Sequence, residues 1–175
     1  LALFFGGSGL SSTPDMILEG DDGFGEVVCS PGDIDKDGLN DILAGTPDSD
    51  AVSIYFGDET ISSTEDVLIT GAETGDGFGQ AVSTLFDMNG DNITDICIGA
   101  PNAESSPGSG INSGAVYVYY GQTTWDAGYD TTDADFRFSI GPEDSSFGIS
   151  LAPALDVDGN GECDLLVGSP DYDTQ

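Results

Sequence analysis

The sequence contains no histidine and almost no positive charge. One lysine, Lys36, and one arginine, Arg137, stand against 33 aspartates and glutamates, so the formal net charge is -31 over 175 residues. The missing histidine removes the commonest general base and a frequent ligand of transition metals. The shortage of lysine and arginine argues against nucleic acid, which proteins hold through contacts of these residues to phosphate. It also argues against docking of a basic patch on anionic lipid.

Cysteine and long hydrophobic runs are scarce as well. The three cysteines, Cys29, Cys97 and Cys163, have no CxxC or other metal-site spacing, and an odd number cannot pair completely within one chain. Cys97 and Cys163 lie in apolar runs, which favours buried thiols over a disulfide. We expect neither a signal peptide nor a transmembrane segment in this sequence.

Glycine and short apolar runs are what the sequence has in abundance. It contains 26 glycines, 38% hydrophobic residues and 20% charged residues, a composition typical of a turn-rich all-β protein. The runs are rich in Val, Ile, Tyr and Phe and are bounded by Gly, Pro and Asp, which is the pattern of strands. No segment has the 3.6-residue apolar periodicity of a helix, so we predict none.

Three nine-residue segments repeat one arrangement of side-chain oxygens. They are DIDKDGLND (33–41), DMNGDNITD (87–95) and DVDGNGECD (156–164), with Asp or Asn at positions one, three and five and Asp at position nine. Hard cations such as Ca²⁺ take six to eight oxygen ligands, and a short carboxylate-rich loop can supply them. Asp, Asn and Gly also make ordinary turns, but three loops in the same register indicate metal binding.

Each acidic loop lies within a longer repeat. A Phe-Gly pair begins at Phe24, Phe78 and Phe147, always nine residues before the first Asp of the loop. An apolar run ending in Gly-x-Pro follows each loop, and two more strand-like segments follow the first two of these runs. A full repeat therefore predicts four strands, with the acidic loop as the hairpin turn between the first two.

Counting outward from the loops divides the chain into four units. We predict residues 1–20 as the outer two strands of a partial unit, 21–71 as a complete unit, 72–141 as a complete unit with long insertions, and 142–175 as the inner two strands of a partial unit. A closed ring of such units needs roughly four to eight of them. The chain is then a piece of a longer ring, one partner of a dimer that shares split units, or a subunit of an open array.

The order Phe-Gly, acidic loop and Gly-Thr-Pro, Gly-Ala-Pro or Gly-Ser-Pro occurs three times. This pattern resembles the FG-GAP repeat family, found in integrin α chains and in many secreted microbial proteins. The resemblance implies an all-β fold of β-propeller-type four-stranded antiparallel blades, about three blades' worth, within a larger propeller or a multi-chain assembly. It also implies Ca²⁺ in the hairpin between the first two strands of each blade, at about three sites.

The resemblance carries the calcium ligands over to fifteen positions. Each loop would hold the ion through the side chains of positions one, three, five and nine and through the carbonyl of position seven. Position six is Gly38, Asn92 or Gly161, so left-handed backbone is expected there. The implied ligands are Asp33, Asp35, Asp37, the Leu39 carbonyl and Asp41; Asp87, Asn89, Asp91, the Ile93 carbonyl and Asp95; and Asp156, Asp158, Asn160, the Glu162 carbonyl and Asp164.

These features together predict a calcium-stabilised, non-catalytic adhesion or scaffold module at the cell surface or outside the cell. A structural subunit of an extracellular filament or split-blade oligomer is one alternative, and an accessory propeller domain of a secreted enzyme is another. We predict no catalytic residue, although a carboxylate pair can hydrolyse glycosides. The expected partners are other chains or further blades at the terminal strands and an extracellular protein or glycan, with no nucleic acid and no membrane insertion.

Overall fold

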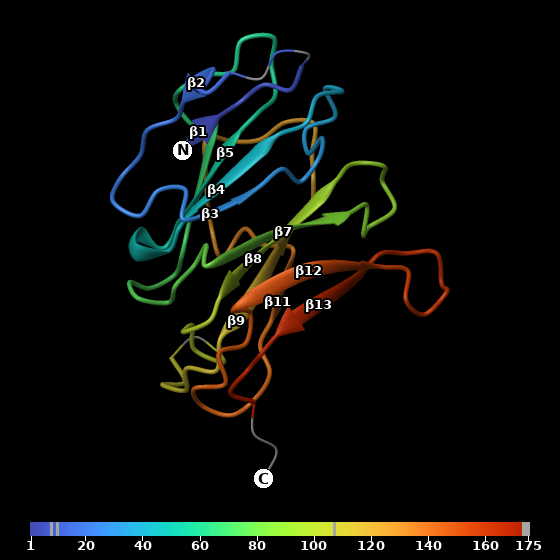
Figure 1. Cartoon of the computed structure of the whole chain (residues 1–175). Coiled ribbons are helices and arrows are strands. Elements are labelled where there is room, and N and C mark those ends of the chain that lie inside the picture. The colour runs from blue at the N-terminus through green and yellow to red at the C-terminus, as the bar shows by residue number, and fades with distance from the viewer. Residues whose placement is uncertain (8, 10, 107, 173–175) are drawn as a thin grey trace.

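The described residues form four β-sheets that follow one another along the sequence. The computed structural model describes residues 1–7, 9, 11–106 and 108–172, and Figure 1 shows the sheets in chain order from the N-terminal pair to the C-terminal hairpin. The strands are β1 Ala2–Leu3, β2 Met16–Ile17, β3 Val27–Cys29, β4 Ile42–Thr46, β5 Ala51–Tyr55, β6 Val67–Thr70, β7 Ala81–Phe86, β8 Asp95–Ala100, β9 Ala115–Tyr119, β10 Gly128–Asp130, β11 Phe136–Phe138, β12 Ser150–Leu155 and β13 Asp164–Gly168.

The all-β prediction is confirmed. Among the described residues the one helical element is a single 3₁₀ turn, η1 (Pro47–Ser49), between β4 and β5. None of the helices in the described part of the chain has the length and apolarity needed to cross a membrane. The open sheets are consistent with part of a β-propeller, as the resemblance to FG-GAP repeats implied.

Consecutive antiparallel strands build both central sheets. One sheet runs β3-β4-β5-β6 and the next runs β7-β8-β9-β11, while β1-β2 and β12-β13 form two-stranded sheets at the two ends. The second strand of each central sheet lies inside the stack: all six residues of β8 are buried, as its uninterrupted apolar sequence predicts. The two-residue periodicity of a half-exposed strand is absent there because neighbouring sheets cover both of its faces.

One insertion adds a strand that its sequence did not predict. Residues 122–135 separate the third and fourth strands of their own repeat, yet β10 within them pairs in parallel with β6 of the preceding repeat, Tyr129 lying opposite Ile69. The preceding sheet thereby gains a fifth strand and one parallel pairing. Parallel pairing needs a long crossover rather than a tight turn, so the three local residues of β10 carry little signal for it.

Trp125 anchors this insertion to the preceding repeat. Its indole N–H donates a hydrogen bond to the backbone carbonyl of Ile34 over 3.2 Å, and its ring meets Tyr129 edge to face with centroids 5.4 Å apart. We expect Trp125→Ala to lower the free energy of unfolding by about 2–3 kcal/mol, since a half-buried aromatic ring and a hydrogen bond are lost together. Urea denaturation measures the change. Trp125→Phe keeps the ring and should recover more than half of it; equal losses in both variants would contradict the anchoring role.

The Phe-Gly pairs lie at the junctions between successive sheets. The Phe78 side chain is fully buried and meets the Tyr117 ring edge to face at 5.5 Å. Gly79 has a φ of +92°, and a Cβ on it would lie 2.6 Å from the Ala51 carbonyl oxygen of the preceding sheet. Gly148 repeats this geometry, with a φ of +92° and a Cβ position 2.7 Å from the Ala115 carbonyl oxygen. Only glycine allows the backbones to approach this closely.

All three cysteines are free thiols. Of the two that were expected to be buried, Cys97 is buried and Cys163 is half-buried. Cys97 is buried within β8 and donates weakly to the Ser83 carbonyl at 3.7 Å. Burial raises the pKa of the Cys97 thiol well above its ordinary value. Such a thiol is a small core residue rather than a nucleophile.

Candidate metal centres

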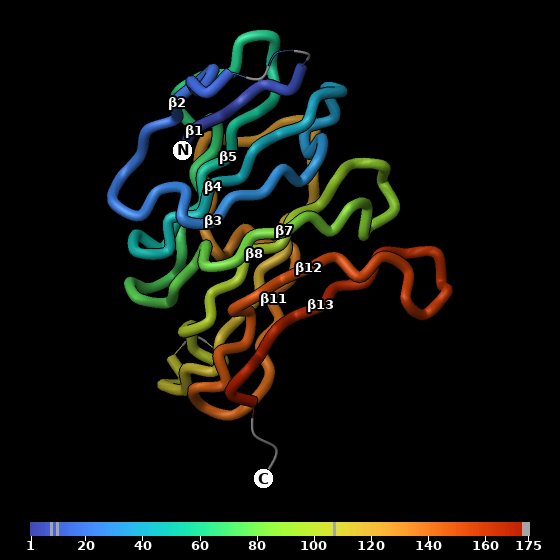
Figure 2. The backbone as a smooth tube through the Cα atoms, in the orientation of Figure 1, coloured from blue at the N-terminus to red at the C-terminus, as the bar shows by residue number. Residues whose placement is uncertain are grey.

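The three acidic loops are the turns of three equivalent hairpins. The loop at 33–41 joins β3 to β4, the loop at 87–95 joins β7 to β8, and the loop at 156–164 joins β12 to β13. In Figures 1 and 2 the three hairpin ends project from the same side of the molecule, one after another. Equivalent places in successive sheets therefore present the same set of oxygen atoms.

Five side-chain to backbone hydrogen bonds recur in every loop. The position-one carboxylate accepts from the N–H groups of positions five and six, position three accepts from position five, position five from position seven, and position nine from position two. In the first loop these are the bonds of Asp33, Asp35, Asp37 and Asp41, at 2.7 to 3.1 Å. The second loop repeats them at 2.8 to 2.9 Å, and the third at 2.7 to 3.0 Å.

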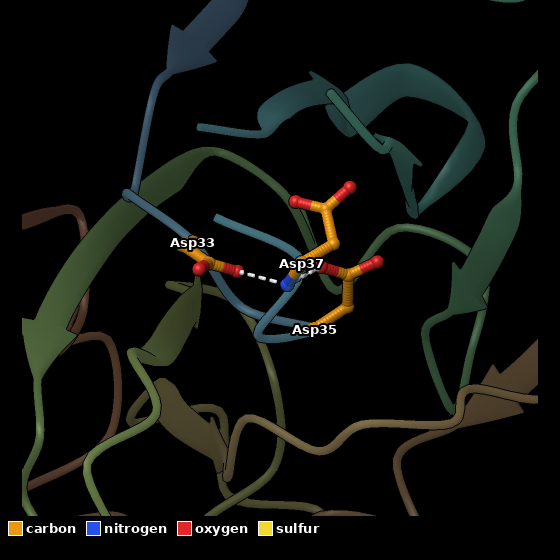
Figure 3. A group of neighbouring side chains, drawn as sticks. All are labelled: Asp33, Asp35 and Asp37. Atoms are coloured by element: carbon orange, nitrogen blue, oxygen red, sulfur yellow. Dashed lines mark hydrogen bonds between the residues drawn. The ribbon is translucent and has the colours of Figure 1, made fainter. Parts of the chain in front are cut away.

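These bonds fold the side-chain oxygens of each loop toward one another. Figure 3 shows the carboxylates of Asp33 and Asp35 both turned toward the backbone nitrogen of Asp37. Carboxylate oxygens of Asp33, Asp35 and Asp37 lie within 4.8 Å of one another, and those of Asp156, Asp158 and Asp164 do the same. The second loop has Asn89 at position three, whose amide nitrogen donates to Asp91 over 3.0 Å.

Crowded like charges give the first loop a reason to hold a cation. Burial raises the pKa of Asp35, the N–H of Asp37 lowers it, and the charges of Asp37 and Asp33 raise it further. The donor set consists of carboxylate, amide and carbonyl oxygens. Such a set suits a hard divalent ion, whereas zinc sites use nitrogen and sulfur as well. The residues present therefore fit Ca²⁺.

The aspartate at position nine does more than face the loop. Asp41 is fully buried and accepts from Ile34 N–H and from Gly57 N–H, each at 2.8 Å. Burial raises its pKa to about 6, although these two N–H groups lower it. Gly57 lies two residues after the last residue of β5, so Asp41 joins the loop to the segment that follows the third strand. Sequence reasoning treated this residue only as a ligand.

Asp95 occupies the same position in the second loop and makes one more bond. It accepts from Met88 and Asn89 N–H at 2.8 and 3.3 Å and from Gly121 N–H at 2.9 Å. Burial raises its pKa, and the hydrogen bonds lower it. Asp164 in the third loop is half-buried and accepts from Val157 N–H at 2.8 Å. The number of backbone groups held by position nine thus falls from three at Asp95 to one at Asp164.

Two positions in each loop have left-handed backbone. Position six was expected to adopt it, and it does so in all three loops. Position four does so as well, with a lysine in the first loop. The φ values are +96° at Gly38, +65° at Asn92 and +96° at Gly161 for position six, and +67° at Lys36, +81° at Gly90 and +79° at Gly159 for position four. The Lys36 ammonium then donates to the Asp91 carbonyl of the second loop over 3.3 Å.

A second recurring aspartate was missed by sequence reasoning. Asp15, Asp66 and Asp135 each precede the fourth strand of a repeat, and their carboxylates accept from the backbone N–H of Phe5, Phe56 and Tyr120 at 2.8, 2.9 and 2.7 Å. The aromatic residue lies immediately before the glycine that ends the third-strand segment. This spacing of ten residues between Phe5 and Asp15 and between Phe56 and Asp66 was available in the sequence.

Asp50 is another structurally important residue that the sequence analysis did not identify, and no aspartate occupies the corresponding position in the next repeat. It is 5% exposed, has a φ of +50°, and accepts from the N–H groups of Gly75, Gly77 and Phe78 at 2.6 to 3.0 Å. These residues lead into the next Phe-Gly pair, so Asp50 fixes the connection between two sheets. The glycine before β9, Gly114, takes the corresponding place in the next repeat, and no pattern of side chains marks the position.

Comparison with known proteins points to the same repeats. Residues 78–119, which include one Phe-Gly pair and the second acidic loop, match the FG-GAP repeat. The chain is 32% identical over 166 residues to integrin alpha-5 of Xenopus laevis, covering 86% of this chain and 15% of that protein. It is 33% identical over 159 residues to integrin alpha-E of Mus musculus, covering 85% of this chain and 13% of that protein. The chain spans less than a sixth of the length of these relatives.

Proposed function

Because residues 78–119 match the FG-GAP repeat and most of the chain is similar to integrin α chains, we propose that this chain is a calcium-stabilised, non-catalytic adhesion or scaffold module that acts outside the cell or at its surface. The observation that carries the proposal is the set of five side-chain to backbone hydrogen bonds that all three acidic loops share. Three equivalent oxygen-lined turns fit one repeated structural task better than a single reaction. Calcium, when bound, would neutralise the crowded carboxylates and lock each hairpin.

We propose one Ca²⁺ per loop. In each loop the ligands would be the side chains of positions one, three, five and nine and the carbonyl of position seven. These are the fifteen positions, five in each of the loops 33–41, 87–95 and 156–164, that the resemblance to FG-GAP repeats implies. The first loop has four carboxylates, whereas Asn89 and Asn160 each remove one charge from the other two. Fewer charged ligands should weaken binding there.

Calcium titration tests this proposal. Isothermal calorimetry should find about three sites, with affinities on the order of 10⁻⁴ to 10⁻³ M as in extracellular modules, and calcium should raise the melting temperature. Asp33→Asn, Asp87→Asn and Asp156→Asn should each remove or weaken one site, while Asp58→Asn, an exposed aspartate outside the loops, should remove none. Binding that is unchanged in all three loop variants would refute the ligand assignment. Turnover of glycosides or phosphate esters, lost on mutation of a carboxylate outside the loops, would refute the non-catalytic role.

A second candidate function is a subunit of a filament or split-blade oligomer. It is favoured by the two-stranded sheets β1-β2 and β12-β13, which hold complementary halves of the four-strand pattern in units 1–20 and 142–175, on either side of the units 21–71 and 72–141. On β12-β13, Leu155 and Leu166 are 62% and 59% exposed, and further blades or another chain could cover them. Light scattering after size exclusion, with and without calcium, separates the candidates: a monomer supports the single module, whereas a dimer or chelator-sensitive fibres support the alternative.

A further inference from the structure

A cavity of about 280 Å³ lies between the N-terminal strand pair and the first central sheet. Its lining includes three carboxylates, Glu19, Asp21 and Glu65, together with Ser53, Tyr55 and Leu68. All three carboxylates are exposed residues, so the cavity opens to solvent on their side. The only two basic side chains lie elsewhere, Lys36 at the second acidic loop and Arg137 at the next junction between sheets. No lysine or arginine side chain therefore balances the negative charge of the cavity.

Tyr55 is among the residues that line this cavity, and its buried hydroxyl has no hydrogen-bond partner in the described part of the chain. The residue as a whole is 1% exposed. A buried polar atom left without a partner costs about 1–3 kcal/mol, so such an atom calls for an explanation. Burial, and after it the charge of Glu65, raises the pKa of this phenol, and the neighbouring Ser53 side chain lowers it. The net shift is upward, so the phenol stays neutral and can accept a hydrogen bond from a cation.

At the equivalent position of the next repeat, an arginine side chain of the protein itself supplies a cation. Ser53 pairs with Leu68 between β5 and β6, and the equivalent pair between β9 and β11 is Tyr117 with Arg137. The Arg137 guanidinium donates to the Tyr117 hydroxyl at 3.2 Å and to the Ser105 carbonyl at 2.8 Å, and lies 5.5 Å from the Tyr117 ring centre. It also donates to the Glu104 carbonyl. The cavity that remains there is about 30 Å³.

The phenol at the equivalent position is also satisfied in the next repeat. Tyr119 corresponds to Tyr55, since each is the last residue of the third strand, and its hydroxyl donates to the Asp130 carbonyl at 3.1 Å. The first central sheet lacks the Arg137 guanidinium, the Tyr117 ring and this carbonyl. Instead, the first central sheet has an open cavity with three carboxylates at its rim and the Tyr55 hydroxyl without a hydrogen-bond partner among the described residues.

We propose that the cavity at Tyr55 is a binding site for an organic cation bearing a guanidinium group. Within it the group would take the place that Arg137 fills at the following junction. Glu19, Asp21 and Glu65 supply the opposite charge, Tyr55 supplies a hydrogen-bond acceptor, and the rings of Phe24 and Tyr55, 6.3 Å apart, supply an aromatic wall for a planar cation. The guanidinium group would be part either of a small-molecule amine such as agmatine or of an arginine side chain of another polypeptide.

Calorimetric titration with agmatine tests the site, with butylurea as the neutral control and 0.3 M salt to suppress non-specific attraction. Agmatine should bind at one site and butylurea should not. Glu65→Gln should weaken agmatine binding roughly tenfold, since one charge-assisted contact is removed, and Tyr55→Phe should weaken it as well. Glu59→Gln, which changes an exposed glutamate outside the cavity, should leave it unchanged.

Transplanting the side chains of the next repeat gives an independent test. The double variant Ser53→Tyr with Leu68→Arg should fill the cavity and abolish agmatine binding without lowering the melting temperature. N-acetyl-arginine methylamide distinguishes the sources: its binding supports a protein side chain as the ligand, and binding of agmatine alone supports a free amine. Agmatine binding no stronger than that of butylurea, or insensitive to both Glu65→Gln and Tyr55→Phe, would overturn the proposal.

Discussion

Replacing Gly79 with alanine is expected to lower the free energy of unfolding by about 3 kcal/mol. Two costs add at this position. A left-handed backbone is unfavourable by about 1–2 kcal/mol for a residue with a Cβ, and Gly79 has a φ of +92°. The new Cβ would also lie 2.6 Å from the Ala51 carbonyl oxygen, and forcing such a contact in packed structure costs about 1–3 kcal/mol. The contacting atom belongs to the backbone of the preceding sheet, so no side chain can move aside.

Gly75→Ala is the matched control. Gly75 has a φ of +96°, almost the same as Gly79, but nothing lies within 4 Å of its Cβ position. It should therefore show only the backbone cost, about 1–2 kcal/mol. Urea denaturation of both variants in saturating calcium measures the difference. Equal destabilisation in the two variants would show that glycine is required at position 79 only for its left-handed backbone and not for the close contact between sheets.

Replacing Asp95 with alanine is expected to destabilise the protein by about 3–5 kcal/mol even when calcium is chelated. The side chain is fully buried, and its loss leaves the N–H groups of Met88, Asn89 and Gly121 without their acceptor. Each buried group left unpaired costs about 1–3 kcal/mol. The measurement is the unfolding free energy in excess chelator, where any contribution from the ion is absent.

Asp164→Ala is the comparison for this variant, because Asp164 holds one N–H group and is half-buried. Its cost in chelator should be about 1 kcal/mol. Adding calcium should then widen the gap between each variant and the unsubstituted protein, since both carboxylates would also lose a place in an ion site. If Asp95→Ala has no effect in chelator, the position-nine aspartate is a ligand and not a link between the loop and the third strand.

The sequence predicted the fold class because the signals for it are local and repeated. Short apolar runs bounded by turns predict strands one by one, and the acidic loops give the hairpins their spacing. The left-handed position six followed from Gly38, Asn92 and Gly161, since few other residues adopt that conformation. The ligand set stays a prediction, because its support is the shared geometry of the oxygens, which is compatible with Ca²⁺.

Other features depended on contacts between distant residues and could not be read locally. The strand β10 pairs with β6 across some sixty positions, Tyr129 lying opposite Ile69, and its own sequence is three unremarkable residues. Asp50 looks like any turn residue until three N–H groups from residues 75 to 78 are placed around it. The spacing of Asp15 and Asp66 was visible, but only the hydrogen bonds give it a meaning.

The absence of histidine, the near absence of lysine and arginine, the short strand-like runs and the three acidic loops in register were enough for the sequence to determine an all-β repeat chain suited to hard cations. Composition and spacing suffice for this, because ligand chemistry and hairpin turns depend on neighbours within nine residues. The tertiary structure alone decided which carboxylates accept hydrogen bonds from backbone N–H groups and which line an open cavity away from Lys36 and Arg137. Those outcomes depend on packing between sheets, where Ser53 and Leu68 line an open cavity and the equivalent Tyr117 and Arg137 fill theirs.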